Sequence, residues 1–91
     1  MDHSWELARL KETGKFVLGE KVTRKMISRG KIVSVVLAQE PHLVARMDDV
    51  NVKKYEVPMN SSQLGNVFGK PFPVSVVGIL DAGGSQFKGN E

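Results

Sequence analysis

The sequence contains no cysteine, few aromatic residues and no long hydrophobic segment. Without cysteine the chain has no thiolate zinc site, disulfide or thiol nucleophile, which fits a reducing compartment. Its longest largely apolar segments, 32–38 and 74–80, have seven residues each, whereas a helix needs roughly 20 to cross a bilayer. The first ten residues are too polar for a signal sequence. We therefore expect a soluble protein that does not contact a membrane.

The patterns expected of catalytic and metal sites are also missing. The two histidines, His3 and His42, are far apart and have no carboxylate at ligand spacing, and no serine lies in a G-x-S-x-G elbow. Segment 65–70 is one residue short of a phosphate-binding loop, and Pro71 stands where that loop needs a hydroxyl for magnesium. We therefore expect no enzyme activity, no cofactor, no metal and no small-molecule substrate.

Positive charge is concentrated in one part of the chain. The 91 residues carry a net charge of +3, but the segment from Arg9 to Lys31 holds eight basic and two acidic residues. That segment is therefore +6 and the remainder is −3. A local positive field of this kind attracts polyanions. The alternative is a solvated lysine-rich helix face without a function.

Helical and extended patterns alternate four times along the chain. Helices are expected from Ser4, over 20–29, from Pro41, and after a cap at Asn60 or Ser61. Strands are expected at 15–18, 32–38, 52–57 and 74–80. This alternation predicts an α/β fold, a three-layer α/β/α sandwich around a four-stranded mixed sheet.

Burial is also predicted from these patterns. Segment 32–38 is apolar almost throughout, so it is expected to be a central strand covered on both faces. The inward side chains of the second and third helices are expected to be Val22, Met26, Ile27, Leu43, Val44 and Met47. We expect a single domain over residues 1–91, with a flexible tail from about residue 82.

The junction between the first strand and the second helix is the most informative segment. Gly19 lets another backbone approach closely, and the helix start at Glu20 and Lys21 offers free N–H groups and the positive end of the helix dipole to an anion. Lys21 can reach a phosphate or a guanine edge. The same basic edge continues along Thr23, Arg24, Lys25 and Arg29. We predict that this edge contacts a phosphate backbone.

A second candidate contact is the loop that contains Phe72. Pro71 and Pro73 stiffen this loop, and Val74 follows it. An aromatic ring held in this way can stack on an unpaired RNA base, so Phe72, Pro73 and Val74 are predicted to cover bases. The alternative is that Phe72 plugs the end of the core.

Three segments resemble a known family. Segment 18–31 resembles the G-x-K-x-T-x-K helix and basic R-x-G-K turn of the eukaryotic and archaeal large-subunit ribosomal protein thirty. Segment 62–70 is similar to the family's N-x-E-L-G-x-x-x-G-K, and segment 79–85 to its closing I-L-E-A-G-D-S. The match runs in order from about Trp5 to Ser85.

The resemblance implies an α/β/α sandwich of the kink-turn-binding ribosomal protein superfamily, located in the cytoplasmic ribosome. Its implied partners are large-subunit rRNA and neighbouring ribosomal proteins. The family's RNA-contacting glycine and lysine correspond to Gly19 and Lys21, its stacking aromatic to Phe72, and the apolar contact after it to Val74.

The chain also departs from the family pattern. The arginine after the aromatic is Pro73, and the glycine after the valine is Ser75. The family's asparagine after the second strand falls near Gln39 or Glu40, and the third helix is about five residues shorter than in the family pattern.

The hypothesis from the sequence is a structural, non-enzymatic RNA-binding protein of the large ribosomal subunit. The first alternative is a kink-turn-binding component of another RNA–protein particle, a branch that usually has an N-E pair where this chain has Glu20 and Lys21. The second alternative is a small α/β enzyme.

Overall fold

The computed structural model describes the backbone of residues 4–84 and the side chains of residues 7–84. Its helices and strands alternate, which confirms the predicted α/β class and mixed sheet. In chain order they are α1 (Ser4–Thr13), β1 (Lys15–Leu18), α2 (Glu20–Ser28), β2 (Ser34–Leu37), α3 (Leu43–Arg46), β3 (Lys53–Glu56), α4 (Ser61–Val67) and β4 (Val76–Asp81).

The last strand is inserted into the middle of the sheet. The strand order is β1-β4-β2-β3, with β4 antiparallel to both β1 and β2, and β3 parallel to β2. Leu18 pairs with Val77 and Leu37 with Val76, so β1 and β2 both end where β4 begins. The ends of β1, β2 and β3 therefore share one edge of the sheet with the start of β4.

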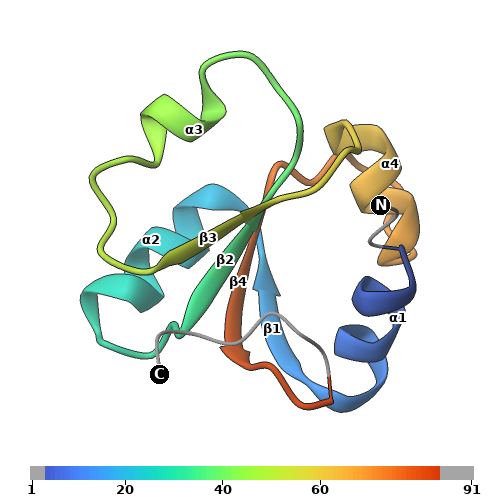
Figure 1. Ribbon diagram of the computed structural model, residues 1–91, viewed down its shortest axis with the longest axis horizontal. Coiled ribbons are helices and arrows are strands. Elements are labelled where there is room, and N and C mark those ends of the chain that lie inside the picture. Colours follow the sequence, from blue (N-terminus) through green and yellow to red (C-terminus); the bar gives the residue numbers. More distant parts are fainter. Residues whose placement is uncertain (1–3, 85–91) are drawn as a thin grey trace.

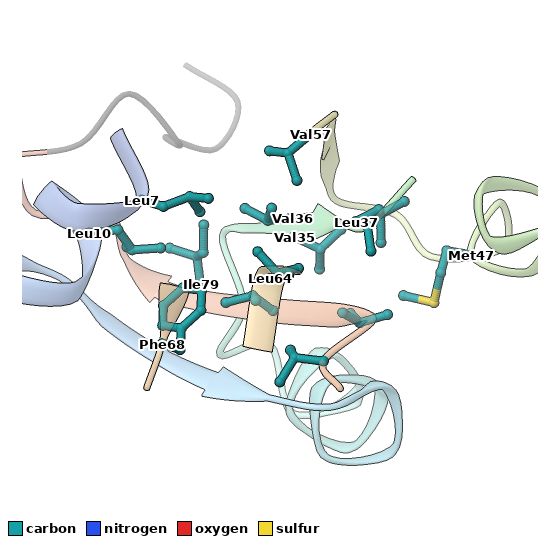
Figure 2. Packing of buried hydrophobic residues seen from close by; sticks show 14 of the residues in the cluster. Leu7, Leu10, Val35, Val36, Leu37, Met47, Val57, Leu64, Phe68 and Ile79 are labelled. Atoms are coloured by element: carbon teal, nitrogen blue, oxygen red, sulfur yellow. The ribbon is translucent and has the colours of Figure 1, made fainter. Parts of the chain in front are cut away.

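Helices cover both faces of the sheet. Figure 1 shows α2 and α3 on one side of the strands and α1 and α4 on the other. On the second face, Leu7 and Leu10 of α1 lie beside Ile79 of β4 and Phe68, as Figure 2 shows, and all four side chains are at most 5% exposed. The Phe68 ring also packs 4.8 Å from that of Phe16. The four residues of β2 are all buried, which confirms it as a central strand.

The helix ends follow the sequence signals. Asn60 forms a capping box with Gln63 in which each side chain bonds the other's backbone N–H over 2.9 Å, and this confirms the cap at Asn60. Gly69 ends the same helix region with a φ of 67°, a left-handed conformation that glycine adopts without strain. The side chain of Ser4, the predicted first cap, lies outside the described residues.

Two helix faces differ from the sequence prediction. Val22 is 37% exposed and Val44 is 43% exposed, so both expectations of burial are wrong. In α2 the inward position belongs instead to Thr23, because residues 23, 26 and 27 share one face at helical spacing. In α3, a helix of four residues, only Leu43 and the following Met47 reach the core.

The end of the described chain is held against α1. Ala82 is 9% exposed, and the backbone N–H of Gly84 donates to the Thr13 hydroxyl over 2.9 Å. The rest of the predicted flexible tail, residues 85–91, lies outside the described residues. Between residues 4 and 84, no helix has the length and apolar character required to span a membrane.

Gly78 on β4 gives a test of how closely α2 packs on the sheet. A Cβ at this position would lie 2.8 Å from both Cγ2 and Oγ1 of Thr23. We expect Gly78→Ala to lower the free energy of unfolding by about 1–3 kcal/mol, as for other overpacked cores. The measurement is urea unfolding of the two proteins. The loss should shrink in a Thr23→Ala background, and an equal loss in both backgrounds would show that the crowding is not at Thr23.

Candidate nucleic-acid interface

Gly19 joins β1 to α2 in a conformation that favours glycine. Its φ is 111°, and an added Cβ would meet only the Cγ1 of Val22, at 3.8 Å. Conformation rather than space therefore requires glycine here. The Gly19 N–H donates to the Val76 carbonyl over 2.8 Å, while its own carbonyl accepts the Thr23 N–H over 3.1 Å. This residue ties the start of α2 to the start of β4.

Three basic residues on and just after α2 are free to meet an anion. Lys21, Lys25 and Arg29 are exposed. None of their three side chains forms a hydrogen bond or ion pair within the described part of the chain. Spaced four residues apart, they fall on one side of the helix. They form a row of positive charge that begins at the N-terminal end of α2.

Arg24, by contrast, is bound within the protein. Its guanidinium donates to both carboxylate oxygens of Asp49 over 3.0 and 3.2 Å, to Glu20 over 3.2 Å and to the Arg46 carbonyl over 2.6 Å. Glu20 in turn accepts three hydrogen bonds from Arg46, the shortest at 2.9 Å. These four residues, the Glu20–Asp49 network, fasten α3 to the start of α2.

The network changes the ionisation of its members. Hydrogen bonds from Arg46 and Arg24 hold the pKa of Glu20 below its ordinary value of 4.5, against the opposing effect of burial. The bond from Arg24 likewise lowers the pKa of Asp49 below 3.8. The pKa of Arg24 is raised, first by Asp49 and then by Glu20. Glu20 and Asp49 thus neutralise two arginines that a phosphate would otherwise attract.

Two of the predicted contact residues lie inside the protein. Thr23 has no exposed surface, and its hydroxyl has no hydrogen-bond partner among the described residues. Val74 is 2% exposed. The sequence prediction that both residues lie on the binding surface is therefore corrected: Thr23 faces β4 beside Gly78, and Val74 anchors its loop in the core.

The loop over residues 70–75 holds Phe72 outward. Two backbone hydrogen bonds fix its ends. The Lys70 N–H donates to the Gly65 carbonyl over 2.9 Å, and the Val74 N–H donates to the Ser61 carbonyl, also over 2.9 Å. The Phe72 carbonyl lies against Gly65, where no Cβ could fit. Phe72 itself is 52% exposed, which contradicts the alternative of a core plug, and Pro73 is exposed as well.

A shallow hollow lies beside this ring. It has a volume of about 320 Å³ and is lined by Ser62, Asn66, Lys70, Pro71, Phe72 and Pro73. It is open to solvent and lies between α4 and the loop. The part of the chain covered by residues 4–84 contains no group of three or more acidic or histidine side chains that could hold a metal ion.

The two halves of the predicted site meet at one edge of the sheet. The loop with Phe72 leads directly into β4, and the first residue of β4, Val76, accepts the hydrogen bond from Gly19. The structure therefore brings together the α2 start and the Phe72 loop, although more than 50 residues separate them in the sequence. Five of the ten predicted residues are exposed and have no side-chain hydrogen bond or ion pair with another described residue: Lys21, Lys25, Arg29, Phe72 and Pro73.

Sequence reasoning missed the role of one carboxylate at this edge. Glu40 accepts the hydroxyl of Ser75 over 2.7 Å and that of Ser61 over 3.1 Å. The sequence marked Glu40 only as lying near a family asparagine, and nothing in the spacing of these three residues indicates contact. The Glu20–Arg24 pair, by contrast, has i,i+4 spacing that the sequence does show.

Comparison with known proteins gives the family of the chain. The model of the ribosomal protein L7Ae/L30e/S12e/Gadd45 family matches residues 4–88. The chain belongs to this family. The resemblance identified from three sequence segments is thereby confirmed.

Several curated relatives of this L7Ae/L30e family member carry the same name, large ribosomal subunit protein eL30. The one from Sulfurisphaera tokodaii is 34% identical over 87 residues, which cover 89% of this chain and 82% of the relative. The one from Methanosphaerula palustris is 36% identical over 93% of this chain and 92% of the relative. The one from Candida glabrata is 33% identical over 88% of this chain and 82% of the relative.

The Glu20–Asp49 network predicts how the stability of this family member depends on pH. A carboxyl whose pKa is lower in the folded than in the unfolded chain stabilises the fold above its unfolded pKa, and this contribution is lost as pH falls through the folded pKa. Glu20→Gln/Asp49→Asn should therefore be less stable than the wild type at pH 7. The gap should close as pH falls below 4.5 and then below 3.8, the ordinary values of the two groups.

Urea unfolding of both proteins across this pH range measures the gap. Glu56→Gln is the matched control, because Glu56 is exposed and lies at the end of β3. A gap between the wild type and the double variant that stays constant from pH 7 to pH 2 would contradict the assignment.

Proposed function

We propose that this chain is a structural constituent of the large ribosomal subunit that binds rRNA at a kink-turn-like element. The observation that carries the proposal is the hydrogen bond between Gly19 and Val76, which places a helix start and an exposed aromatic ring at one edge of the sheet. The names of the relatives, all large ribosomal subunit proteins, support the same assignment. These relatives are named as structural components of the translation machinery and not as enzymes.

In this proposal the phosphate backbone lies along the free row of cations. Lys21, Lys25 and Arg29 neutralise successive phosphates, and the N–H groups at the start of α2 receive one of them. Gly19 allows the RNA backbone to come close at the bend before the helix. Glu20 and Arg24 act indirectly, because their side chains hold α3 in place beside this row.

Phe72 and Pro73 contact the bases. An unstacked base lies on the exposed ring of Phe72, as RNA-binding proteins commonly read unpaired nucleotides. Val74 contributes by fixing the loop from inside the core. The partners of the protein are then large-subunit rRNA and neighbouring ribosomal proteins, and its location is the cytoplasmic ribosome.

The row of free cations predicts a salt dependence. Binding to a kink-turn RNA should weaken steeply as salt rises, since each neutralised phosphate releases counterions. Changing Lys21, Lys25 or Arg29 to Ala should each lower the slope of log K against log salt by about 1. Fluorescence anisotropy titrations at several salt concentrations give these slopes.

The matched control for lost charge is Lys53→Ala. Lys53 is exposed at the start of β3, the end of the strand opposite the site, so its removal should leave the slope unchanged. If the slope is unchanged in all three variants, or if it falls equally in the Lys53→Ala control, the RNA binds elsewhere on the surface.

Phe72→Ala should separate RNA binding from stability. Loss of a base stacked on an aromatic ring costs roughly 1–3 kcal/mol of binding free energy, while the half-exposed ring contributes little to the core. Phe68→Ala is the opposite control, because that ring is 5% exposed and its removal should cost the fold roughly 3–5 kcal/mol. Thermal melts beside RNA titrations measure both effects, and a large drop in melting temperature for Phe72→Ala would return that ring to the core.

A further inference from the structure

One carboxylate joins the three segments that border the proposed site. Glu40 follows β2, Ser61 begins α4, and Ser75 precedes β4. The Ser75 hydroxyl donates to Oε1 of Glu40 over 2.7 Å, and the Ser61 hydroxyl donates to Oε2 over 3.1 Å. Hydrogen bonds to an ionised carboxylate are roughly twice as strong as those between neutral groups. Glu40 therefore links these segments more firmly than neutral side chains would.

The backbone around Glu40 connects the same segments. The Ala38 N–H donates to the Ser75 carbonyl over 2.9 Å, and the Val74 N–H donates to the Ser61 carbonyl over 2.9 Å. Each of the two serines thus pairs once through its backbone carbonyl and once through its hydroxyl. Together these bonds fix the position at which the Phe72 loop enters β4.

The exposed ring of Phe72 needs such support. About half of its surface faces water, and burying apolar surface is favourable, so a loose loop would fold the ring back onto the protein. Within the described residues the ring is instead held outward by anchors on both sides of it. Of these anchors, Glu40 provides the charged side-chain link.

We propose that Glu40 is a positioning residue for RNA binding, which acts through Ser61 and Ser75 on the orientation of Phe72. The proposal rests on the RNA-binding function given above. Glu40 itself contacts no base and acts only by holding the loop. In this proposal the Ser75 hydroxyl connects the Phe72 loop to Glu40, because it donates a hydrogen bond to that carboxylate.

The charge of Glu40 makes the proposal sharply testable. A carboxylate beside a polyanion-binding surface repels phosphate, so its removal should tighten RNA binding by electrostatics alone. A positioning role predicts the opposite sign, because the loop loses its orientation when the carboxylate is removed. The direction of the change therefore distinguishes the two effects.

The experiment compares variants in titrations with a fluorescent kink-turn RNA. We expect Glu40→Ala to weaken binding about tenfold, the change that corresponds to ~1.4 kcal/mol. Glu40→Gln keeps an acceptor oxygen without the charge and should recover most of this loss. Ser75→Ala, which removes only one hydroxyl, should weaken binding to a smaller degree. The control Glu56→Ala, which removes an exposed carboxylate at the same edge of the sheet, should not weaken it.

A double-mutant cycle with Phe72 tests the route of the effect. If Glu40 acts through the ring, Glu40→Ala should cost little further affinity in a Phe72→Ala background. An equal loss in both backgrounds, or tighter binding by Glu40→Ala, overturns the proposal. Thermal melts of Glu40→Ala and Ser75→Ala show whether each is folded at the assay temperature, and Ser75→Ala decides the matter if Glu40→Ala is not.

The outcomes also separate this inference from the proposed function. A wild-type protein that does not bind the RNA overturns both. Binding that depends on Phe72 and on the free cations, but not on Glu40, overturns only the positioning role.

Discussion

The antiparallel insertion of β4 between β1 and β2 determines where every other part of the site lies. Because β4 runs against both neighbours, its start meets the ends of the two strands that come earlier in the chain. A helix begins after β1, and a rigid loop precedes β4. The same topology that completes the sheet thus brings the helix start and the aromatic loop together.

The basic residues on and beside α2 fall into two groups. Arg24 and Arg46 are neutralised by Glu20 and Asp49 and serve to attach α3. Exposed ion pairs of this kind are individually weak, but here they share partners and include the bidentate Arg24 fork on Asp49. The side chains of the two lysines of α2, Lys21 and Lys25, have no such partner within the described residues. Net charge alone therefore overstates how many cations are available to a ligand, because pairing within the fold neutralises some of them.

Much of the fold was predictable from the sequence because its signals are local. Near-continuous Val, Ile and Leu marked the central strand, and Asn60 with Gln63 marked a helix cap. In α2 the sequence predicted burial of Val22, the more apolar residue, but the neighbouring Thr23 is buried instead. Thr23 shares the face of residues 26 and 27. A threonine fits there because Gly78 leaves room beneath it.

The candidate site was predictable only in part. Phe72 is exposed because hydrogen bonds to Gly65, Ser61 and Glu40 fix the loop around it. The pairing of Arg24 with Asp49 joins residues 25 positions apart. Such contacts depend on tertiary structure, which hydrophobic periodicity does not encode. The carboxylate of Glu40 accepts hydrogen bonds from two serines 21 and 35 positions further along the chain, so these contacts form only when the sheet is assembled.

Protein–RNA crosslinking within large ribosomal subunits from the native source would show which residues contact rRNA. Peptides that carry crosslinked nucleotides are identified by mass spectrometry. We expect crosslinks at Lys21, Lys25 and Phe72, at the edge of the sheet where β4 begins. Crosslinks confined to α1 or β3, or absence of the protein from the subunits, would contradict this expectation.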